Sequence, residues 1–224
     1  MSVTLDELIV ADEAEVWEAC GFRVEGGTCE VGEVRLRFTP PIGEQSGLVG
    51  WSLRGLAKGR GDDAGLDGLP TADTAAGPPA EAASVHPNGV EALDHVVAVS
   101  PDLDRTVAAL QGAGLDLRRI REEPTPAGAP RQAFFKLGGP LLEVVQEPAE
   151  ATERHGGDRP AFFWGLAFLV GDVDAAAKDL GDRAGEPRPA IQPGRRIVTF
   201  RRSAGLSLPV ALMSRPESSS IRSG

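Results

Sequence analysis

Hydrophobic positions alternate along the chain in short runs that predict strands, and these runs recur in a fixed order with helical segments. The clearest run begins at residue 90, where VEALDHVVAVS is rich in β-branched residues and suits a strand. The next segment, PDLDRTVAALQGAG, places Leu103, Val107 and Leu110 on one helical face and ends in glycines. Three strand candidates follow: LDLRRIREE, RQAFFKLGG and LLEVVQE. Residues 91–148 therefore predict a strand, a helix and three further strands.

The same order returns in the last third of the chain. FFWGLAFLV, from residue 162, predicts a strand, and GDVDAAAKDLG predicts a short helix with Asp172 as its N-cap. A fainter copy opens the chain with TLDELIVAD, EAEVWEACGF and three later strand candidates. Repeats of this length are stronger evidence than any single element. We therefore predict an α+β fold of repeated βαβββ modules forming curled mixed sheets, over residues 3–55, 91–148 and 161–214.

The segments between and after these units differ in composition. Residues 56–90 are dominated by Gly, Pro, Ala, Asp and Thr without apolar periodicity, which predicts a linker. Residues 215–224 predict a flexible tail. We expect residues 91–214 to form the main domain, which leaves the degenerate unit within residues 1–55 with an unpaired sheet. That sheet should pack against the main domain or pair across a homodimer, because an open sheet edge is prone to aggregation.

Composition and charge exclude several classes of function. The 224 residues carry 33 acidic and 23 basic side chains, for a net charge of −10, which disfavours binding to nucleic acid or anionic membranes. The N-terminus has acids where a signal peptide needs lysine or arginine, and the longest apolar run, residues 161–171, is too short to span a bilayer. We expect a cytoplasmic protein from a bacterium with a GC-rich genome, whose partner is a small molecule.

The second unit also resembles a known family. LDHVVAVSPDLDRTVAALQGAGL followed by FFKLGGPLLEVVQEP resembles one module of the vicinal oxygen chelate superfamily, which includes glyoxalase I, the bleomycin resistance proteins and extradiol dioxygenases. The resemblance implies paired modules that curl into a cup around a ligand. It implies no single reaction, because this superfamily hosts many. It therefore implies either a lyase, isomerase or dioxygenase acting on a small oxygenated metabolite, or a metal-free binding protein of the bleomycin-resistance type.

The resemblance also implies a set of site residues. Superfamily members that use a metal take it from the first and last strands of two paired modules, which in the second unit implies His95 and Glu143. In the third unit these align with Gly165 and Pro209, which cannot ligate, and in the first unit His95 aligns with Glu7. Zn, Ni, Mn or Fe could then be held by His95 and Glu143 with Glu7 as a third ligand. Alternatively no cofactor is used, and His95 and Glu143 are catalytic residues that move a proton.

Strand alternation singles out the same two side chains. Glu143 shares a face with Leu141 and Val145, and His95 shares a face with Leu93 and neighbouring valines. A carboxylate between apolar neighbours is costly to desolvate unless something pairs with it. The functional interpretation is a site in the cup, and the alternative is a His–Glu hydrogen bond retained in a binding cavity.

Further residues are candidates for ligand contact. Alternation puts Arg196 and Arg202 on one face beside the apolar strand 197–200, where they would bind a carboxylate or phosphate or else form the solvated ends of an edge strand. Phe134 and Trp164 would form an aromatic wall of the cup or else belong to the core. The same anion-binding and solvated alternatives apply to Arg118, Arg119 and Arg131.

Overall fold

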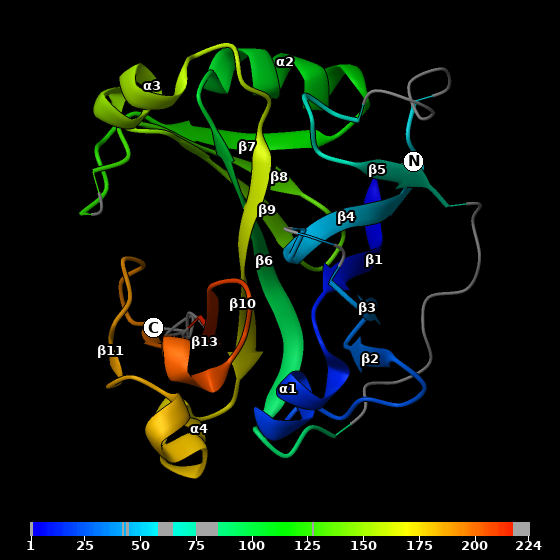
Figure 1. Ribbon diagram of the computed structural model, residues 1–224. Helices are drawn as coiled ribbons and strands as arrows, with labels where there is room; N and C mark the ends of the chain where they lie inside the picture. The colour runs from blue at the N-terminus through cyan, green and yellow to red at the C-terminus, as the bar shows by residue number, and fades with distance from the viewer. Residues whose placement is uncertain are drawn as a thin grey trace, which may run out of the picture.

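The computed structural model describes residues 2–41, 43, 45–57, 65–74, 85–126 and 128–216. These residues form two β-sheets, one of eight strands and one of five, with helices outside them (Figure 1). The predicted α+β class with curled mixed sheets is confirmed. Within the described ranges, no helix is both long and apolar enough to cross a membrane. Most of the predicted tail, residues 217–224, lies outside the described residues.

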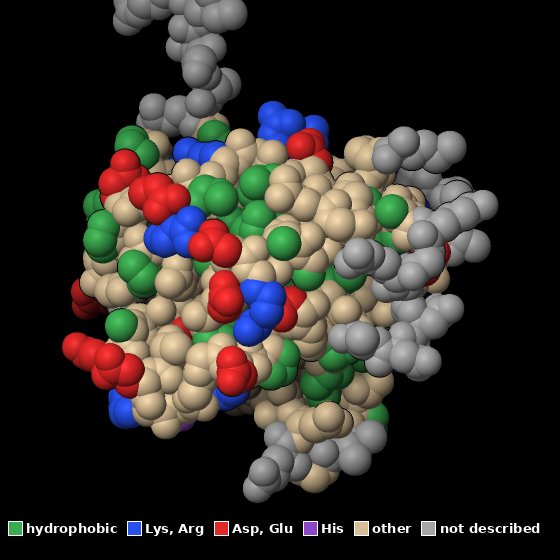
Figure 2. Space-filling view, turned by 90° about the horizontal axis from the view of Figure 1, so that it is seen from above, with side chains coloured by type: hydrophobic (Ala, Val, Ile, Leu, Met, Phe, Trp, Pro, Cys, Tyr) green, Lys and Arg blue, Asp and Glu red, His purple; other side chains and the backbone are tan. Residues whose placement is uncertain are grey.

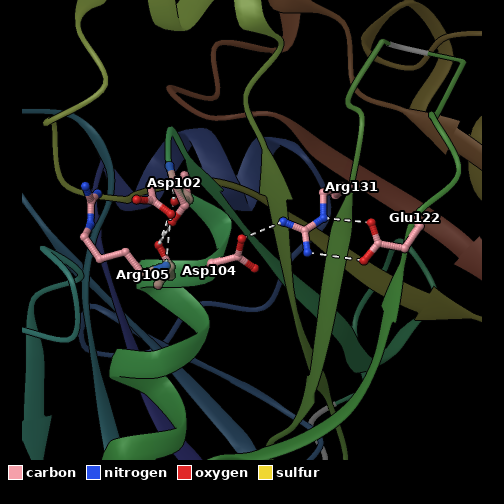
Figure 3. Close-up of polar contacts among 7 residues, drawn as sticks. Asp102, Asp104, Arg105, Glu122 and Arg131 are labelled. Atoms are coloured by element: carbon pink, nitrogen blue, oxygen red, sulfur yellow. Dashed lines mark hydrogen bonds and ion pairs between the residues drawn. The ribbon is translucent and has the colours of Figure 1, made fainter.

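The second predicted unit forms one half of the large sheet. Its elements are β6 (Val90–Ser100), α2 (Leu103–Gly112), β7 (Asp116–Arg121), β8 (Gln132–Lys136) and β9 (Leu141–Gln146). β6 pairs in parallel with β9, and β8 and β7 follow in antiparallel pairing. Asp102 caps α2 by accepting a hydrogen bond of 3.0 Å from the backbone N–H of Arg105 (Figure 3). The apolar stripe of α2 is buried against the sheet.

The third predicted unit forms the other half of the same sheet. Its elements are β10 (Phe162–Val170), α4 (Val173–Leu180), η1 (Gly181–Arg183), β11 (Arg188–Pro189), β12 (Arg196–Thr199), η2 (Arg202–Ala204) and β13 (Val210–Ser214), and α3 (Ala149–His155) precedes them. β10 runs antiparallel to β6 at the centre of Figure 1, giving the order β11-β12-β13-β10-β6-β9-β8-β7. Asp172 caps α4 through the backbone N–H groups of Asp174 and Ala175. The two units therefore share one continuous sheet.

The N-terminal sheet departs from the predicted βαβββ unit. Its elements are β1 (Thr4–Ala11), α1 (Ala14–Ala19), β2 (Thr28–Val31), β3 (Val34–Thr39), β4 (Gly47–Arg54) and β5 (Thr71–Asp73). We expected β4 to be the last strand of the module. Instead β3 is the parallel partner of β1, and β4 pairs antiparallel with β1 on its other side. β5 then lies parallel to β4.

The order β2-β3-β1-β4-β5 matches that of five central strands of the large sheet, β8-β9-β6-β10-β13, in both sequence and direction of pairing. The N-terminal sheet therefore contains one module shortened by a strand, followed by the first and last strands of a second. The sequence pattern could not reveal this, because alternation predicts a strand but not the neighbour with which it pairs.

Part of the segment predicted as a linker belongs to this sheet. β5 lies within residues 56–90, and Leu66 and Leu69 before it are buried. The carboxylate of Asp67 accepts hydrogen bonds from Arg105 Nε, at 2.7 Å, and from Thr106 Oγ1, both on α2. These contacts come from distant parts of the chain, so local composition did not predict them. Residues 58–64 and 75–84 of the predicted linker lie outside the described residues.

The two sheets pack face to face through aromatic side chains. The ring centroids of Phe22 and Phe168 are 5.2 Å apart, and those of Trp51 and Phe163 are 5.1 Å apart. The buried carboxylate of Asp12 accepts hydrogen bonds of 3.1 Å from the Trp17 indole and from the backbone N–H of Ser207. The N-terminal sheet thus packs against the large sheet of the same chain, one of the two arrangements expected.

The outer surface carries mixed charge. Seen from above, the face that includes α2 and α3 shows acidic and basic side chains next to one another among apolar ones (Figure 2). No broad basic area covers the described residues on this face, in keeping with the net charge of −10.

Candidate active site in the large sheet

A pocket of about 630 Å³ lies on the face of the large sheet that turns away from the N-terminal sheet. Side chains of β6, β7, β8 and β9 form one wall, and the loop of residues 190–193 together with β12 and β13 forms the other. Four of the candidate residues named from the sequence, His95, Glu143, Phe134 and Arg119, line this pocket. The first and last strands of the second unit bring His95 and Glu143 together because β6 and β9 are direct neighbours.

His95 is the centre of a chain of polar contacts. Its Nδ1 lies 2.7 Å from Oδ2 of Asp94, and its Nε2 lies 3.6 Å from Oε2 of Glu143. The guanidinium group of Arg195 donates to both oxygens of Asp94, at 2.8 and 3.4 Å, and its Nε donates to the carbonyl oxygen of Ser214 at 2.8 Å. The four side chains that make these contacts, Arg195, Asp94, His95 and Glu143, are largely buried.

A β-bulge explains how two consecutive residues contact each other on one face. In the pairing of β6 with β10, His95 lies opposite Ala167 and Leu93 lies opposite Phe168, so Asp94 is an extra residue. A bulge of this kind reorients a side chain that would otherwise point to the opposite face. It also moves Leu93 to the face opposite His95, contrary to the simple alternation expected. Leu93 is accordingly 4% exposed and belongs to the core.

The electrostatic environment differs between the two carboxylates. Burial raises the pKa of Asp94, but hydrogen bonds from His95 and Arg195 outweigh this effect, so its pKa is lowered overall and it stays ionised. Burial raises the pKa of Glu143, and the proximity of His95 and a hydrogen bond from Gln132 Nε2 offset this only in part. The pKa of one carboxyl is therefore lowered and that of its neighbour across His95 is raised.

The strand registers locate the equivalent positions in the third unit. Asp102 and Asp172 cap equivalent helices, so His95 corresponds to Gly165, as predicted. Glu143 pairs with Val97, which lies two residues after His95. The equivalent of Val97 in the third unit is Ala167, two residues after Gly165. Ala167 pairs with Ala211, so Ala211 is the counterpart of Glu143. The predicted alignment of Glu143 with Pro209 was therefore wrong by two residues, since the shorter loops of the third unit change the spacing.

The third unit lacks polar groups at these equivalent positions. A Cβ atom at Gly165 would lie 2.7 Å from the carbonyl oxygen of Pro209, so no side chain fits there. A second bulge, at Trp164, is the counterpart of the bulge at Asp94. The two halves of the sheet therefore share their geometry, but His95, Asp94 and Glu143 are replaced by Gly165, Trp164 and Ala211.

A family model agrees with this geometry. Residues 92–200 match the model of the Glyoxalase/Bleomycin resistance protein/Dioxygenase superfamily. These residues belong to the glyoxalase superfamily. The match begins within β6 and ends just after β12, so it includes the residues that line the pocket except Met213 of β13.

Solved structures are similar to this chain over different lengths. Methylmalonyl-CoA epimerase from Mycobacterium tuberculosis is 19% identical, with a TM-score of 0.46, over 57% of this chain and 90% of the epimerase. A Streptomyces coelicolor methylmalonyl-CoA epimerase is 23% identical, with a TM-score of 0.46, over 57% of this chain and 96% of its own. A xylose isomerase-like TIM barrel/4-hydroxyphenylpyruvate dioxygenase fusion protein is 13% identical, with a TM-score of 0.60.

The fusion protein is similar over 96% of this chain, so the likeness in fold includes the N-terminal sheet, and this chain spans about half (49%) of that protein. This is consistent with the glyoxalase-like strand order in both sheets. No curated protein matches the chain in sequence.

Many glyoxalase-superfamily proteins use a divalent metal, and the donors present here do not fit such a centre. Within the described residues, no three His, Cys, Asp or Glu side chains are placed to hold a metal ion. His95 and Glu143 offer two donors, one fewer than catalytic metal sites generally use. The proposed third ligand, Glu7, lies on β1 of the other sheet, where its carboxylate accepts a hydrogen bond of 3.0 Å from Arg37. The structure therefore does not bring the three predicted ligands together.

The other candidates for ligand contact do not line the pocket: Arg118, Arg131, Trp164, Arg196 and Arg202. Arg196 is exposed and pairs with Asp174 at 2.7 Å, and Arg202 is exposed on η2. Trp164 is 49% exposed. Sequence reasoning missed Asp94, Gln132 and Arg195, which contact His95 and Glu143 directly or through one another. An Asp directly before a His on an apolar strand was the available signal, but alternation assigned it to the opposite face.

Proposed function

We propose that this chain is an enzyme that moves a proton on a small oxygenated metabolite, as an isomerase or a lyase. The observation that carries the proposal is the pair formed by His95 and Glu143 inside the pocket, with Asp94 and Arg195 behind His95. A histidine oriented by a buried carboxylate, beside a carboxyl group whose pKa is raised, is suited to general acid–base catalysis.

In this proposal His95 is the base. Its Nδ1–H donates to Asp94, so the lone pair of the neutral ring lies on Nε2, on the side of Glu143. Nε2 takes a proton from a carbon next to a carbonyl group of the substrate. The charged ring that results is stabilised by the ionised Asp94, which Arg195 holds in place.

Glu143 is the acid. Because its pKa is raised, Glu143 keeps its proton to a higher pH than an ordinary carboxyl group does. In the protonated form it donates this proton to the carbonyl oxygen as the neighbouring C–H bond breaks. The electrons of that bond form the carbon–carbon double bond of an enol. Return of a proton to a different carbon completes an isomerisation, whereas departure of a leaving group from the next carbon completes an elimination.

Deuterium exchange tests this proposal. The full chain would be incubated in D₂O with a panel of small ketones and oxo acids, and loss of the C–H signal would be followed by proton NMR. We expect the wild type to exchange protons of at least one compound. His95→Gln and Glu143→Gln should each slow the exchange at least about 100-fold, the lower range for loss of a general acid or base. Arg196→Gln, an exposed control, should exchange like the wild type.

A metal-free binding protein of the bleomycin-resistance type is the second candidate. It is supported by the third unit, where Gly165 and Ala211 stand at the positions equivalent to His95 and Glu143, and where the apolar Ile197 and Met213 line the pocket. A wall of this kind suits binding without chemistry. Ligand binding without exchange of any compound in the panel would favour this candidate over the enzyme.

A further inference from the structure

The arginines near the pocket differ in whether a carboxylate neutralises them. Arg131 pairs with Glu122, at 2.9 Å, and with Asp104 of α2, at 3.0 Å (Figure 3). Arg121 pairs with Glu123 at 3.2 Å. Arg119 lines the pocket, and the described residues give it no carboxylate within ion-pair distance.

Arg119 is nevertheless held in place. Its guanidinium carbon lies 4.7 Å from the centroid of the Phe134 ring, a separation typical of a cation–π contact. A cation–π contact uses no N–H donor, so the N–H groups of Arg119 stay available to a ligand. An arginine oriented in this way loses little further freedom when it binds a planar anion.

The strand registers place Arg119 in line with the proposed acid. Arg119 lies opposite Phe134, and Phe134 lies opposite Glu143, on three successive strands of one face. Neighbouring strands are roughly 4.8 Å apart, so the backbones of Arg119 and Glu143 are separated by about 10 Å. A ligand lying along this face of the sheet would reach the guanidinium group of Arg119 at one end and Glu143 and His95 at the other.

We propose that Arg119 binds the carboxylate of the ligand, so that the pocket takes small monocarboxylic acids with an apolar body. One unpaired arginine matches a single negative charge, whereas a phosphate dianion would also face Glu123 across the same pocket. The apolar body would contact Ile191, Ile197 and Met213 on the opposite wall. The position of a reacting carbon at the far end of the ligand rests on the proposed function. The recognition of the carboxylate by Arg119 does not depend on it.

Binding of matched compounds tests the inference. The probes are carboxylic acids with bodies of two to ten carbons, including 3-phenylpropanoate, each compared with its neutral amide by titration calorimetry. We expect the wild type to bind at least one acid about tenfold more tightly than its amide, which corresponds to about 1.4 kcal/mol. Arg119→Gln should abolish this preference, and Arg119→Lys should retain part of it because the charge remains.

Arg118→Gln is the matched control. Arg118 is the preceding residue of β7, is exposed, pairs with Asp116 at 3.2 Å and does not line the pocket. Its variant should bind the acids like the wild type. The inference would be overturned if no acid of the panel binds, if Arg119→Gln keeps the preference, or if phenyl phosphate binds more tightly than every acid.

The same titrations separate this inference from the proposed function. A His95→Gln/Glu143→Gln double variant should lose proton exchange and keep the Arg119-dependent preference for acids. If the wild type prefers acids in a way that depends on Arg119 but exchanges no protons, the proposed enzyme function is contradicted and the carboxylate site is supported. Exchange in the wild type without a preference for acids would overturn the carboxylate site alone.

Discussion

Asp94 connects the buried charge of Arg195 to the chemistry of His95. It accepts hydrogen bonds from both, and the bulge in β6 is what allows it to do so. His95 itself was predictable from the sequence, because a histidine on a strand of apolar residues is conspicuous. Asp94 was not, since alternation places it on the opposite face and only the pairing with β10 reveals the bulge.

Replacing Asp94 with Asn should slow the reaction while the shape of the site stays nearly the same. Asn keeps the size of the side chain but removes the charge that stabilises the protonated His95, so we expect proton exchange at least about tenfold slower. The variant also leaves Arg195 buried without a carboxylate, which should lower thermal stability. Exchange is therefore measured well below the unfolding midpoint. An Asp94→Asn variant with the exchange rate of the wild type would contradict the role of Asp94.

Glu143 should make the fold less stable as the pH rises. Burial raises its pKa above the ordinary value of 4.5, so the folded chain keeps a proton that the unfolded chain releases. The free energy of unfolding therefore falls as the pH increases from about 4.5 through the folded-state pKa. We expect Glu143→Gln to unfold at a higher denaturant concentration than the wild type at pH 8 and at a similar one at pH 4.

Glu150→Gln is the control for this titration, because Glu150 is exposed on α3 and its variant makes the same change in net charge. Its difference from the wild type should stay small at both pH values. If Glu143→Gln behaved like Glu150→Gln, Glu143 would not be a destabilising buried charge.

At the scale of elements, the strands and helices of residues 91–214 follow closely from the sequence. Their alternation, the capping Asp102 and Asp172 and the glycines after α2 are local signals. β4 and β5 are different, because their place in the sheet depends on distant partners. β5 has only three residues, and it is aligned by Asp67 and the buried Leu69 rather than by its own pattern.

Asp67 should stabilise the attachment of this segment to α2. Its backbone φ is 52°, a left-handed conformation that Asn also tolerates, so Asp67→Asn mainly removes the charge facing Arg105. We expect a loss of about 1.5–3 kcal/mol in the free energy of unfolding, the range for a hydrogen bond to a charged group. Hydrogen exchange at the β5 amides should become faster. Asp104→Asn removes the charge of an exposed ion pair and is the control. It should change the free energy of unfolding and the exchange of the β5 amides much less than Asp67→Asn does.

His86 holds the segment before β6 against the N-terminal sheet. Its Nδ1 accepts a hydrogen bond of 3.0 Å from the backbone N–H of Arg23, and its Nε2 lies 3.0 Å from the carbonyl oxygen of Glu30. Accepting at Nδ1 requires a neutral ring, and burial lowers the pKa of His86 from its ordinary value of 6.5. The unfolded chain therefore binds this proton more readily than the folded chain does.

The free energy of unfolding should decrease as the pH is lowered through the range in which His86 titrates. Its contribution is complete above pH 6.5 and is lost as the pH decreases toward the folded-state pKa. In His86→Gln, the free energy of unfolding should be lower than that of the wild type at pH 7.5, and it should depend less on pH between 5 and 7. An equally steep dependence in the variant would show that another group is responsible.

At the scale of the whole molecule, two sheets with the same strand order pack face to face, and only one half of one sheet carries the polar site. The N-terminal sheet covers the face of β6 and β10 opposite the pocket, so it supports the site without contributing to its lining. The sequence indicated the repeat and the loss of donors in the third unit. It did not indicate the second module of the N-terminal sheet, which is reduced to β4 and β5, because a unit of two strands has no helix and too short a pattern to recognise.

We propose that His95 and Glu143 move a proton on a ligand bound in the large sheet. The most direct test is proton NMR of the full chain in D₂O with the compound that binds most tightly, compared with the His95→Gln/Glu143→Gln double variant. We expect deuterium at the carbon beside the carbonyl group with the wild type and none above background with the double variant. Equal incorporation by both proteins, or none by either when the ligand is bound, would contradict it.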